Sequence, residues 1–511
     1  MFQWCCLAFC LVCCSSFSFA ATQKPHIVMI VADDLGWDDV SFHGSNQIPT
    51  PGIDYLANNG IILNNYYVQP VCTPTRSCFM TGRYPIHTGL QNGVIMGWAP
   101  YGLGLDEKTL PQYLKELGYS THGIGKWHLG FYKPDYTPTY RGFDSYFGLW
   151  TGKEDYYSHI DDEYHGYIGY DLNDGMKEVA RDYQGQYGTE LFTSKAIDVI
   201  KAQAMKNVNT SLFLYLAHQA VHSANPSAPL QAPQHLIDQF SHIDNKQRRI
   251  YAAMATSLDQ SVTNITAALK SNGLWNNTVI IFTTDNGGPA YSDYNVACNW
   301  PLRGRKATLW EGGVRGVACV HSPLISEKNS KRVSMDLMHA TDWLPTIVRL
   351  AGGNAEHMKP ANKTLDGFDM WDTISKGADS PRTEILHNID GKHAALRVGD
   401  FKLLVGQGNN TWYPMPTVRL EAETPIPGAV VRCGDRPSGV RDCDATKSPC
   451  LFNISADPCE FSDLSLKEPD VVERLMRRLD AYKETVVPSR NKALDPKSNP
   501  KLHGGDWVPW E

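Results

Sequence analysis

The sequence predicts an α/β fold with a central, mostly parallel β-sheet, and two observations carry this prediction. Short apolar runs rich in β-branched residues alternate with longer amphipathic segments, and each run ends abruptly in polar or glycine-containing sequence. Continuous apolar runs of this length suit strands that are buried on both faces of a parallel sheet. Their alternation with helical segments is typical of a sandwich in which helices cover the sheet.

Three apolar runs are the clearest candidates for central strands, at residues 26–32, 211–217 and 278–284. Helical patterns occupy residues 110–117 and 250–269. In open α/β sheets, ligands gather at the carboxyl ends of the strands. The polar residues that follow the three runs are therefore candidates for a functional site.

The character of the chain changes near Arg382. Residues 394–405 read as a hairpin around Gly399 and Asp400, and residues 471–485 read as an amphipathic helix. Between them lie a proline-rich stretch and a cluster of cysteines. We therefore predict a large domain over residues 21–381. A smaller C-terminal α+β domain, with an antiparallel sheet, the cysteine cluster and the helix, is predicted over residues 382–511.

The chain has 511 residues and 42% hydrophobic content, enough for a large core. Its formal charge of −7 argues against a general nucleic-acid binder, which needs a basic face. Residues 2–20 carry no charge and end in small residues, which predicts a signal peptide over residues 1–20. The alternative is a membrane anchor, since the stretch is nearly long enough to span a bilayer. After cleavage we expect no membrane span.

Glycosylation sequons and cysteines agree with the secretory pathway, either secreted or lysosomal. The sequons are Asn209, Asn264, Asn276, Asn362, Asn409 and Asn453. The clustered cysteines, Cys433, Cys443, Cys450 and Cys459, predict two disulfides with three possible connectivities. Cys319 lies in the apolar run 317–320 and is expected to be a buried free thiol, whereas Cys78 and Cys298 could pair or stay free.

Two pairs of oxygen-bearing side chains follow predicted strands. Asp33 and Asp34 come after the first run, and Asp285 and Asn286 come after the run at 278–284. Side chains that converge at one sheet edge in this way would suit a hard cation such as Ca²⁺ or Mg²⁺. The alternative for either pair alone is a helix cap or a turn.

The segment 72–76 reads CTPTR, and residues 81–83 read TGR. A cysteine before a helix start is a candidate for a thiol of low pKa, and the structural alternative is half of a disulfide. The pattern closely resembles the sulfatase signature C-x-P-S-R with its downstream T-G-R/K, except that Thr75 stands where serine is usual. In that family the cysteine, here Cys72, is oxidised during secretion to Cα-formylglycine.

Further segments resemble the same family in the same order, from about residue 25 to about residue 400. Residues 125–130 read GKWHLG, residues 301–306 read PLRGRK and lead to WEGG at 310–313, and Val221 precedes His222. The residues of these motifs are most similar to those of the arylsulfatase B group, the N-acetylgalactosamine 4-sulfatases, and its invertebrate relatives.

The resemblance implies an alkaline-phosphatase-like sandwich, one Ca²⁺ per chain and a role for each matching residue. The Ca²⁺ ligands would be Asp33, Asp34, Asp285, Asn286 and the modified Cys72. Arg76 would orient the formylglycine and Asp285 would activate its attacking hydroxyl. Lys126, His222 and Lys306 would hold the sulfate and the leaving oxygen, with His222 as general acid, and His128 would assist sulfate expulsion. His218 is expected to be structural.

The chemistry explains why such a family modifies a cysteine. A hydrated aldehyde carries two hydroxyls on one carbon, so one can attack sulfur and the other can then expel sulfate. A serine would become a sulfate ester with no second hydroxyl to release it. Maturation would require a formylglycine-generating enzyme as a partner.

The sequence is also compatible with two rival functions and does not identify the substrate. A phosphatase or phosphodiesterase of the same superfold would use serine or threonine with two Zn²⁺, and a non-enzymatic glycan-binding protein would have lost a site residue. The first choice of substrate is the N-acetylgalactosamine 4-sulfate of dermatan or chondroitin sulfate. The alternative is a dietary sulfate ester, either an algal polysaccharide or a glucosinolate. A short insertion at residues 223–229 could shape the pocket.

Overall fold

The computed structural model describes residues 24–163, 166–206, 210–292, 294–408, 411–416, 426–440 and 442–511. The predicted signal peptide and the sequons at Asn209 and Asn409 lie outside these residues. Within them, every helix is too short or too polar to cross a bilayer.

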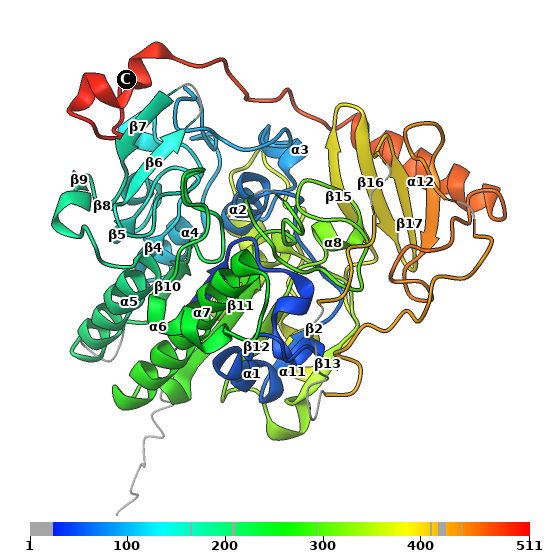
Figure 1. The fold of residues 1–511 in the computed structure, drawn as a ribbon, viewed down its shortest axis with the longest axis horizontal. Helices are drawn as coiled ribbons and strands as arrows, with labels where there is room; N and C mark the ends of the chain where they lie inside the picture. The colour runs from blue at the N-terminus through cyan, green and yellow to red at the C-terminus, as the bar shows by residue number, and fades with distance from the viewer. Residues whose placement is uncertain are drawn as a thin grey trace, which may run out of the picture.

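A ten-stranded sheet runs through the centre of the molecule (Figure 1). Its core is formed by four neighbouring parallel strands in the order β11 (Thr278–Thr284), β1 (His26–Ala32), β10 (Leu212–Ala217) and β4 (Ser120–Gly125). The remaining strands are β2 (Ile61–Leu63), β5 (Ser145–Gly148), β8 (Asn173–Asp174), β9 (Lys177–Glu178), β12 (Ala318–His321) and β13 (Arg332–Ser334). The antiparallel pairs lie towards the two edges. The predicted mixed, mostly parallel sheet is confirmed.

Helices cover both faces of this sheet. Alternate side chains of each buried strand point to opposite faces and pack into two different hydrophobic cores. On β1, Val28 and Ile30 belong to one core and Met29 and Val31 to the other. The first core is closed by α5 (Gly188–Ala204) and α7 (Lys246–Ser271), which lie side by side in Figure 1. The second is closed by α2 (Cys72–Thr81), α4 (Leu110–Glu116) and α9 (Trp343–Leu350). The helices predicted at 110–117 and 250–269 are α4 and α7.

The C-terminal part forms a four-stranded antiparallel sheet in the order β15 (Glu384–Asp390), β16 (His393–Val398), β17 (Phe401–Val405) and β18 (Cys450–Asn453). The strands β16 and β17 are the predicted hairpin. The predicted helix is α12 (Pro469–Lys483), whose Leu475 and Leu479 pack in one core with residues of this sheet. The shorter elements are α1 (Pro51–Asn58), β3 (Tyr66–Tyr67), α3 (Pro85–Thr88), β6 (Ile160–Glu163), β7 (Tyr167–Tyr170), α6 (Gln234–Ile237), α8 (Glu311–Val314), β14 (Met338–His339), α10 (Ala355–Met358) and α11 (Trp371–Lys376).

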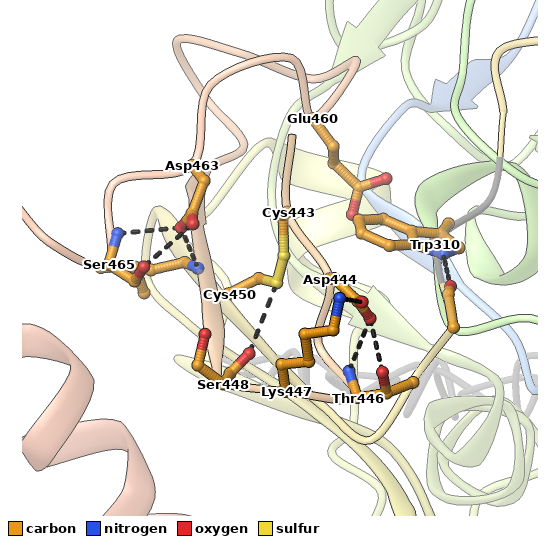
Figure 2. Close-up of a disulfide and its surroundings, with 12 residues drawn as sticks. Trp310, Cys443, Asp444, Thr446, Lys447, Ser448, Cys450, Glu460, Asp463 and Ser465 are labelled. Atoms are coloured by element: carbon orange, nitrogen blue, oxygen red, sulfur yellow. Dashed lines mark hydrogen bonds and ion pairs between the residues drawn. A yellow bond between two sulfur atoms is a disulfide. The ribbon is translucent and has the colours of Figure 1, made fainter. Parts of the chain in front are cut away.

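Two disulfides join the clustered cysteines, Cys433–Cys459 and Cys443–Cys450, which selects one of the three connectivities. Figure 2 shows the second disulfide in the same neighbourhood as Trp310 and Glu460, so it lies where the C-terminal sheet meets the larger part of the chain. Cys319 is a buried free thiol, as predicted, and Cys78 and Cys298 stay free.

Beyond α12 the chain runs back across the molecule to the region of β7, a path drawn in red in Figure 1. We call residues 487–511 the C-terminal strap. It is held by backbone hydrogen bonds from Val487 to Ile86 (2.9 Å), from Asp495 to Trp98 (3.2 Å) and from Trp507 to Tyr170 (3.0 Å). The Trp507 side chain is completely buried. The strap therefore connects the C-terminal sheet to α3, to the loop that follows α3 and to β7.

Candidate active site

The four central parallel strands end at one edge of the sheet, and the polar residues that follow them meet there. Asp285 N lies 3.1 Å from the Ala32 carbonyl, and Lys126 N lies 2.7 Å from the Ala217 carbonyl, so the strand ends are aligned. The side chains gathered at this edge are Asp33 and Asp34 after β1, Asp285 and Asn286 after β11, Lys126 and His128 after β4, and His222 after β10. Parallel pairing is what places them together.

Cys72 also lies at this site. It is the first residue of α2 and follows the extended residue Val71. Its Sγ lies 3.7 Å from Asp33 Oδ1, and the side chain is buried. Burial, together with the Asp33 charge, raises the pKa of the thiol to about 12. The prediction of a low-pKa thiol is therefore wrong, because desolvation outweighs the helix N-terminus. An unmodified Cys72 would be a poor nucleophile here.

Arg76 lies one helical turn after Cys72 and is completely buried between two carboxylates. Its Nη2 lies 3.1 Å from Asp33 Oδ2, and its Nε lies 3.0 Å from Asp285 Oδ2. Its Nη1 donates to the Lys126 carbonyl at 2.9 Å. The Lys126 ammonium also contacts Asp33. Although burial raises the pKa of Asp33, these cations, Lys126 foremost, hold it well below its ordinary value.

Thr75, at the position where the sulfatase signature has serine, is fully accommodated. Its side chain is buried, and its Oγ1 accepts a hydrogen bond from Gln69 N at 2.9 Å. The hydroxyl thus satisfies a buried backbone donor, which a serine hydroxyl could also do. The departure from the signature adds only a methyl group to the packing.

Asp34 is the second carboxylate of the site and adopts a left-handed backbone conformation, with φ 61°. Lys306 Nζ lies 2.6 Å from its Oδ1, Asn286 Nδ2 donates to the same oxygen at 2.6 Å, and His222 Nε2 lies 3.6 Å from its Oδ2. Burial raises the pKa of Asp34. Although burial lowers the pKa of Lys306, the Asp34 charge holds it above its ordinary value. Lys306 is therefore a cation at the site.

The donor set is suited to a hard cation. Asp33, Asp34, Cys72 and His222 each offer one potential ligand atom, and these atoms lie within 4.8 Å of one another. Asp285 Oδ1 and Asn286 Oδ1 are buried and have no hydrogen-bond partner among the described residues. Burial raises the pKa of Asp285 to about 6. Buried oxygens without partners are costly unless something binds them, and carboxylate and amide oxygens favour Ca²⁺ or Mg²⁺.

His128 is held by contacts that no local sequence pattern predicts. Its Nε2 lies 2.9 Å from the Ile95 carbonyl, and its own carbonyl accepts a hydrogen bond from Thr73 Oγ1 at 3.0 Å. A Cβ on Gly152 would lie 2.9 Å from the imidazole, so glycine lets the ring pack there. Burial, then the Lys126 charge, holds the pKa of His128 well below its ordinary value. Thr73 occupies the unspecified position of the C-x-P-S-R pattern, so the motif gave no signal for it.

His222 and Lys306 are the side chains of the site that reach solvent, with 15% and 17% of their side-chain area exposed. His222 Nδ1 lies 2.6 Å from the Ser223 carbonyl, which leaves Nε2 directed towards Asp34. Burial, then the Lys306 charge, lowers the pKa of His222. His218, by contrast, is completely buried with Nε2 2.9 Å from Ser261 Oγ, a packing position outside the site.

The segment 223–229, which the sequence predicts to be an insertion, is anchored to β6. Asn225 is buried, its Nδ2 donates to the Ile160 carbonyl at 2.8 Å, and its Oδ1 accepts from Lys153 Nζ and Asp162 N, each at 3.0 Å. The segment therefore holds a defined position directly after His222.

Lys306 is placed by backbone contacts on both sides. Its N donates to the Gly288 carbonyl at 3.1 Å, and Ala307 N donates to the Pro70 carbonyl at 2.8 Å. A Cβ on Gly287 would collide with the Gly312 carbonyl, so the segment after Asn286 packs directly on α8. Glu311 of α8 is a buried acid, and no local sequence pattern predicts its ion pair with Lys402 of the C-terminal sheet.

Comparisons with known proteins agree with this geometry. A family model described as Sulfatase matches residues 25–353. Mouse arylsulfatase J is 45% identical over 515 residues, covering 96% of this chain and 81% of that protein. Human N-acetylgalactosamine-6-sulfatase is 28% identical, covering 96% of this chain and 89% of that protein. The crystal structure of Ps i-CgsB in complex with k-i-k-neocarrahexaose superposes with a TM-score of 0.75 and 29% identity, over 94% of this chain and 98% of that chain.

The matched region spans every residue gathered at the sheet edge, from Asp33 to Lys306. The predicted fold and the predicted family are confirmed, and the phosphatase and non-enzymatic alternatives are set aside. The chain belongs to the sulfatase family and is a sulfuric ester hydrolase.

Proposed function

We propose that this sulfatase hydrolyses sulfate esters of glycans through a Cα-formylglycine made from Cys72, with one Ca²⁺ at the carboxyl edge of the sheet. The observation that carries the proposal is the burial of Cys72 beside Asp33, in a site that also holds Arg76, Lys126 and Lys306. An anionic sulfate group needs such a concentration of positive charge. The sulfatase family generally uses formylglycine and Ca²⁺, and the donor set fits both.

The metal would be held by Asp33, Asp34, Asp285, Asn286 and the modified Cys72. The buried oxygens of Asp285 and Asn286 that lack partners among the described residues support this assignment. When bound, a Ca²⁺ ion would supply positive potential to the sulfate oxygens. When formed and hydrated, the formylglycine would supply one hydroxyl for attack and a second for sulfate release.

The remaining roles follow from position. Arg76 spans Asp33 and Asp285, so it orients the residue at position 72 from one helical turn away. Asp285 would be the base that takes the proton of the attacking hydroxyl. Lys126 and Lys306 stabilise the charge that builds on the sulfate oxygens. His222, at the open side of the site, would give a proton to the leaving alcohol, because a bound sulfate beside it favours the imidazolium form and offsets the lowering of its pKa. His128 would assist sulfate expulsion.

The substrate that we propose first is an N-acetylgalactosamine 4-sulfate within dermatan or chondroitin sulfate. Relatives named N-acetylgalactosamine-6-sulfatase support a galactosamine ester, and the neocarrahexaose bound to Ps i-CgsB supports a carbohydrate. A dietary sulfate ester, either algal polysaccharide or glucosinolate, is the second candidate. We place the protein in the secretory pathway, secreted or lysosomal, where it would meet the formylglycine-generating enzyme.

One experiment on the unmutated protein tests the proposal. Protein secreted by a eukaryotic host should release sulfate from a sulfated sugar, contain about one Ca²⁺ per chain, and yield a Cys72 peptide lighter than its thiol form. Active protein in which Cys72 is wholly unmodified would overturn the formylglycine assignment. Two stoichiometric zinc ions would overturn the metal assignment.

Replacing His222 by alanine tests its role as general acid. We expect the rate on a sugar sulfate to fall by about 10²–10³-fold, because an alkoxide leaves poorly without a proton. The loss on nitrophenyl sulfate should be much smaller, since a phenolate leaves without protonation. Steady-state kinetics on both substrates give the comparison.

His218→Ala is the matched control, because it removes the other histidine of this segment and should alter stability rather than the ratio of the two rates. Equal losses on both substrates would leave His222 as a sulfate-binding group.

A further inference from the structure

Beside the site, two tyrosines and an arginine lie together, and we call them the tyrosine–arginine platform: the exposed Tyr291 and the half-buried Tyr413 and Arg305. The rings of Tyr291 and Tyr413 are stacked, with centroids 5.6 Å apart and planes within 7° of parallel. The Arg305 guanidinium lies 5.8 Å from the centre of the Tyr413 ring, and its Nη1 donates to the Ala290 carbonyl at 3.2 Å.

Two of the three residues are on segments that lead away from the active site. Arg305 immediately precedes Lys306, whose side chain contacts Asp34. Tyr291 follows three residues after Gly288, whose carbonyl accepts a hydrogen bond from Lys306 N. Three residues span about 10 Å at most, so the backbone of Tyr291 lies within that reach of Gly288, the residue that positions Lys306. Tyr413 is brought alongside because Gly304 N donates to the Thr411 carbonyl at 3.0 Å.

Packing does not account for this arrangement. Tyr291 is 52% exposed, and it adopts a left-handed backbone conformation, with φ 49°, which is uncommon for a residue with a bulky side chain. Tyr294 nearby is 50% exposed. Large aromatic side chains grouped in solvent beside a site are typical of binding surfaces rather than of cores. A flat aromatic face binds the apolar face of a sugar ring, and a neighbouring arginine binds a sulfate or a carboxylate.

We propose that the tyrosine–arginine platform binds the sugar next to the one whose sulfate is removed, so that the enzyme acts on sulfated oligosaccharide chains rather than on isolated sulfate esters. The inference rests on the proposed function, because Arg305 directly precedes Lys306 of the proposed sulfate site. Tyr291 stacks on the neighbouring pyranose, and Arg305 binds an anionic group of that sugar. A repeating anionic glycan supplies both features in consecutive residues, whereas a small aryl sulfate ends within the sulfate site.

The test compares Tyr291→Ala and Arg305→Gln with the unmutated enzyme on three substrates: a chondroitin 4-sulfate tetrasaccharide, N-acetylgalactosamine 4-sulfate and nitrophenyl sulfate. We expect KM for the tetrasaccharide to rise about 3- to 10-fold in each variant with kcat unchanged. The constants for the two small substrates should not change.

Tyr291→Phe keeps the aromatic face and should keep the KM of the unmutated enzyme. Tyr140→Ala, which removes a 55% exposed tyrosine outside the platform, is the matched control and should change nothing.

Each other outcome is decisive. An unchanged KM for the tetrasaccharide, or equal rises on all three substrates, would overturn the subsite. An enzyme that hydrolyses nitrophenyl sulfate but neither sugar would overturn the subsite and the proposed glycan substrate, while leaving the sulfatase chemistry intact. An enzyme that releases sulfate from none of them would overturn the proposed function itself. Thermal melting of each variant separates these results from a folding defect.

Discussion

Cys72→Ser is expected to stop turnover at the first half of the reaction. A serine oxygen can still form a bond to sulfur while the ester S–O bond breaks and the leaving alcohol takes a proton. The serine sulfate that results has no second hydroxyl on its carbon to expel sulfate. We expect the steady-state rate to fall by at least on the order of 10³-fold, the scale at which loss of a nucleophile acts. Mass spectrometry of the variant after incubation with substrate should show a sulfate on the substituted serine.

The fold should survive this change, because serine is slightly smaller than cysteine and the site is already polar. The matched control is Cys78→Ser in the same helix, where a buried free thiol lies outside the ion-pair network of the site. That variant should keep its activity. A Cys72→Ser enzyme with normal turnover would contradict the need for a modified cysteine. An inactive variant with no sulfated peptide would contradict the expected arrest after the first half of the reaction.

The central sheet could be predicted because its sequence signal is local. The runs at 26–32 and 278–284 have the bounds of β1 and β11, since continuous apolar sequence is what a doubly buried strand requires. The convergence of Asp33 with Asp285 then follows from parallel pairing alone. The roles of Lys126, His222 and Lys306 came from resemblance, because a single basic residue carries no signal of the pocket that it faces.

Other features depend on contacts between distant parts of the chain, which no local pattern encodes. The pKa of Cys72 is set by complete burial, which the sequence around it does not reveal. The C-terminal strap reads as irregular polar sequence, yet Trp507 is fully buried far from α12. The pairing of Cys443 with Cys450 was one of three equal possibilities. Lys402 lies in a strand of the predicted hairpin, but nothing in the sequence links it to Glu311.

Lys402 joins the C-terminal sheet to α8 through a buried ion-pair triad. Its Nζ lies 2.9 Å from Glu311 Oε1 and 2.9 Å from Glu460 Oε1, and all three side chains are completely buried. Glu460 also accepts a hydrogen bond from Glu311 N at 2.9 Å. Although burial raises the pKa of Glu311, the Lys402 charge holds it below its ordinary value. Burial raises the pKa of Glu460 to about 7, although the Lys402 charge acts to lower it.

Lys402→Met should therefore destabilise the protein strongly, by roughly 3–5 kcal/mol, because it leaves two buried carboxylates without their cation. This loss of folding stability should depend on pH. A carboxyl whose pKa is raised on folding contributes stability below its unfolded pKa and loses it as pH rises through the folded pKa. Without Lys402 the folded pKa of Glu460 rises further, so the fall in melting temperature should be smallest near about pH 5 and largest near about pH 8. Lys447→Met is the matched control, since Lys447 is 81% exposed and solvent screens its pair with Asp444. A Lys402→Met protein that melts like this control, or that loses the same amount at both pH values, would show that the triad does not hold the C-terminal sheet in place.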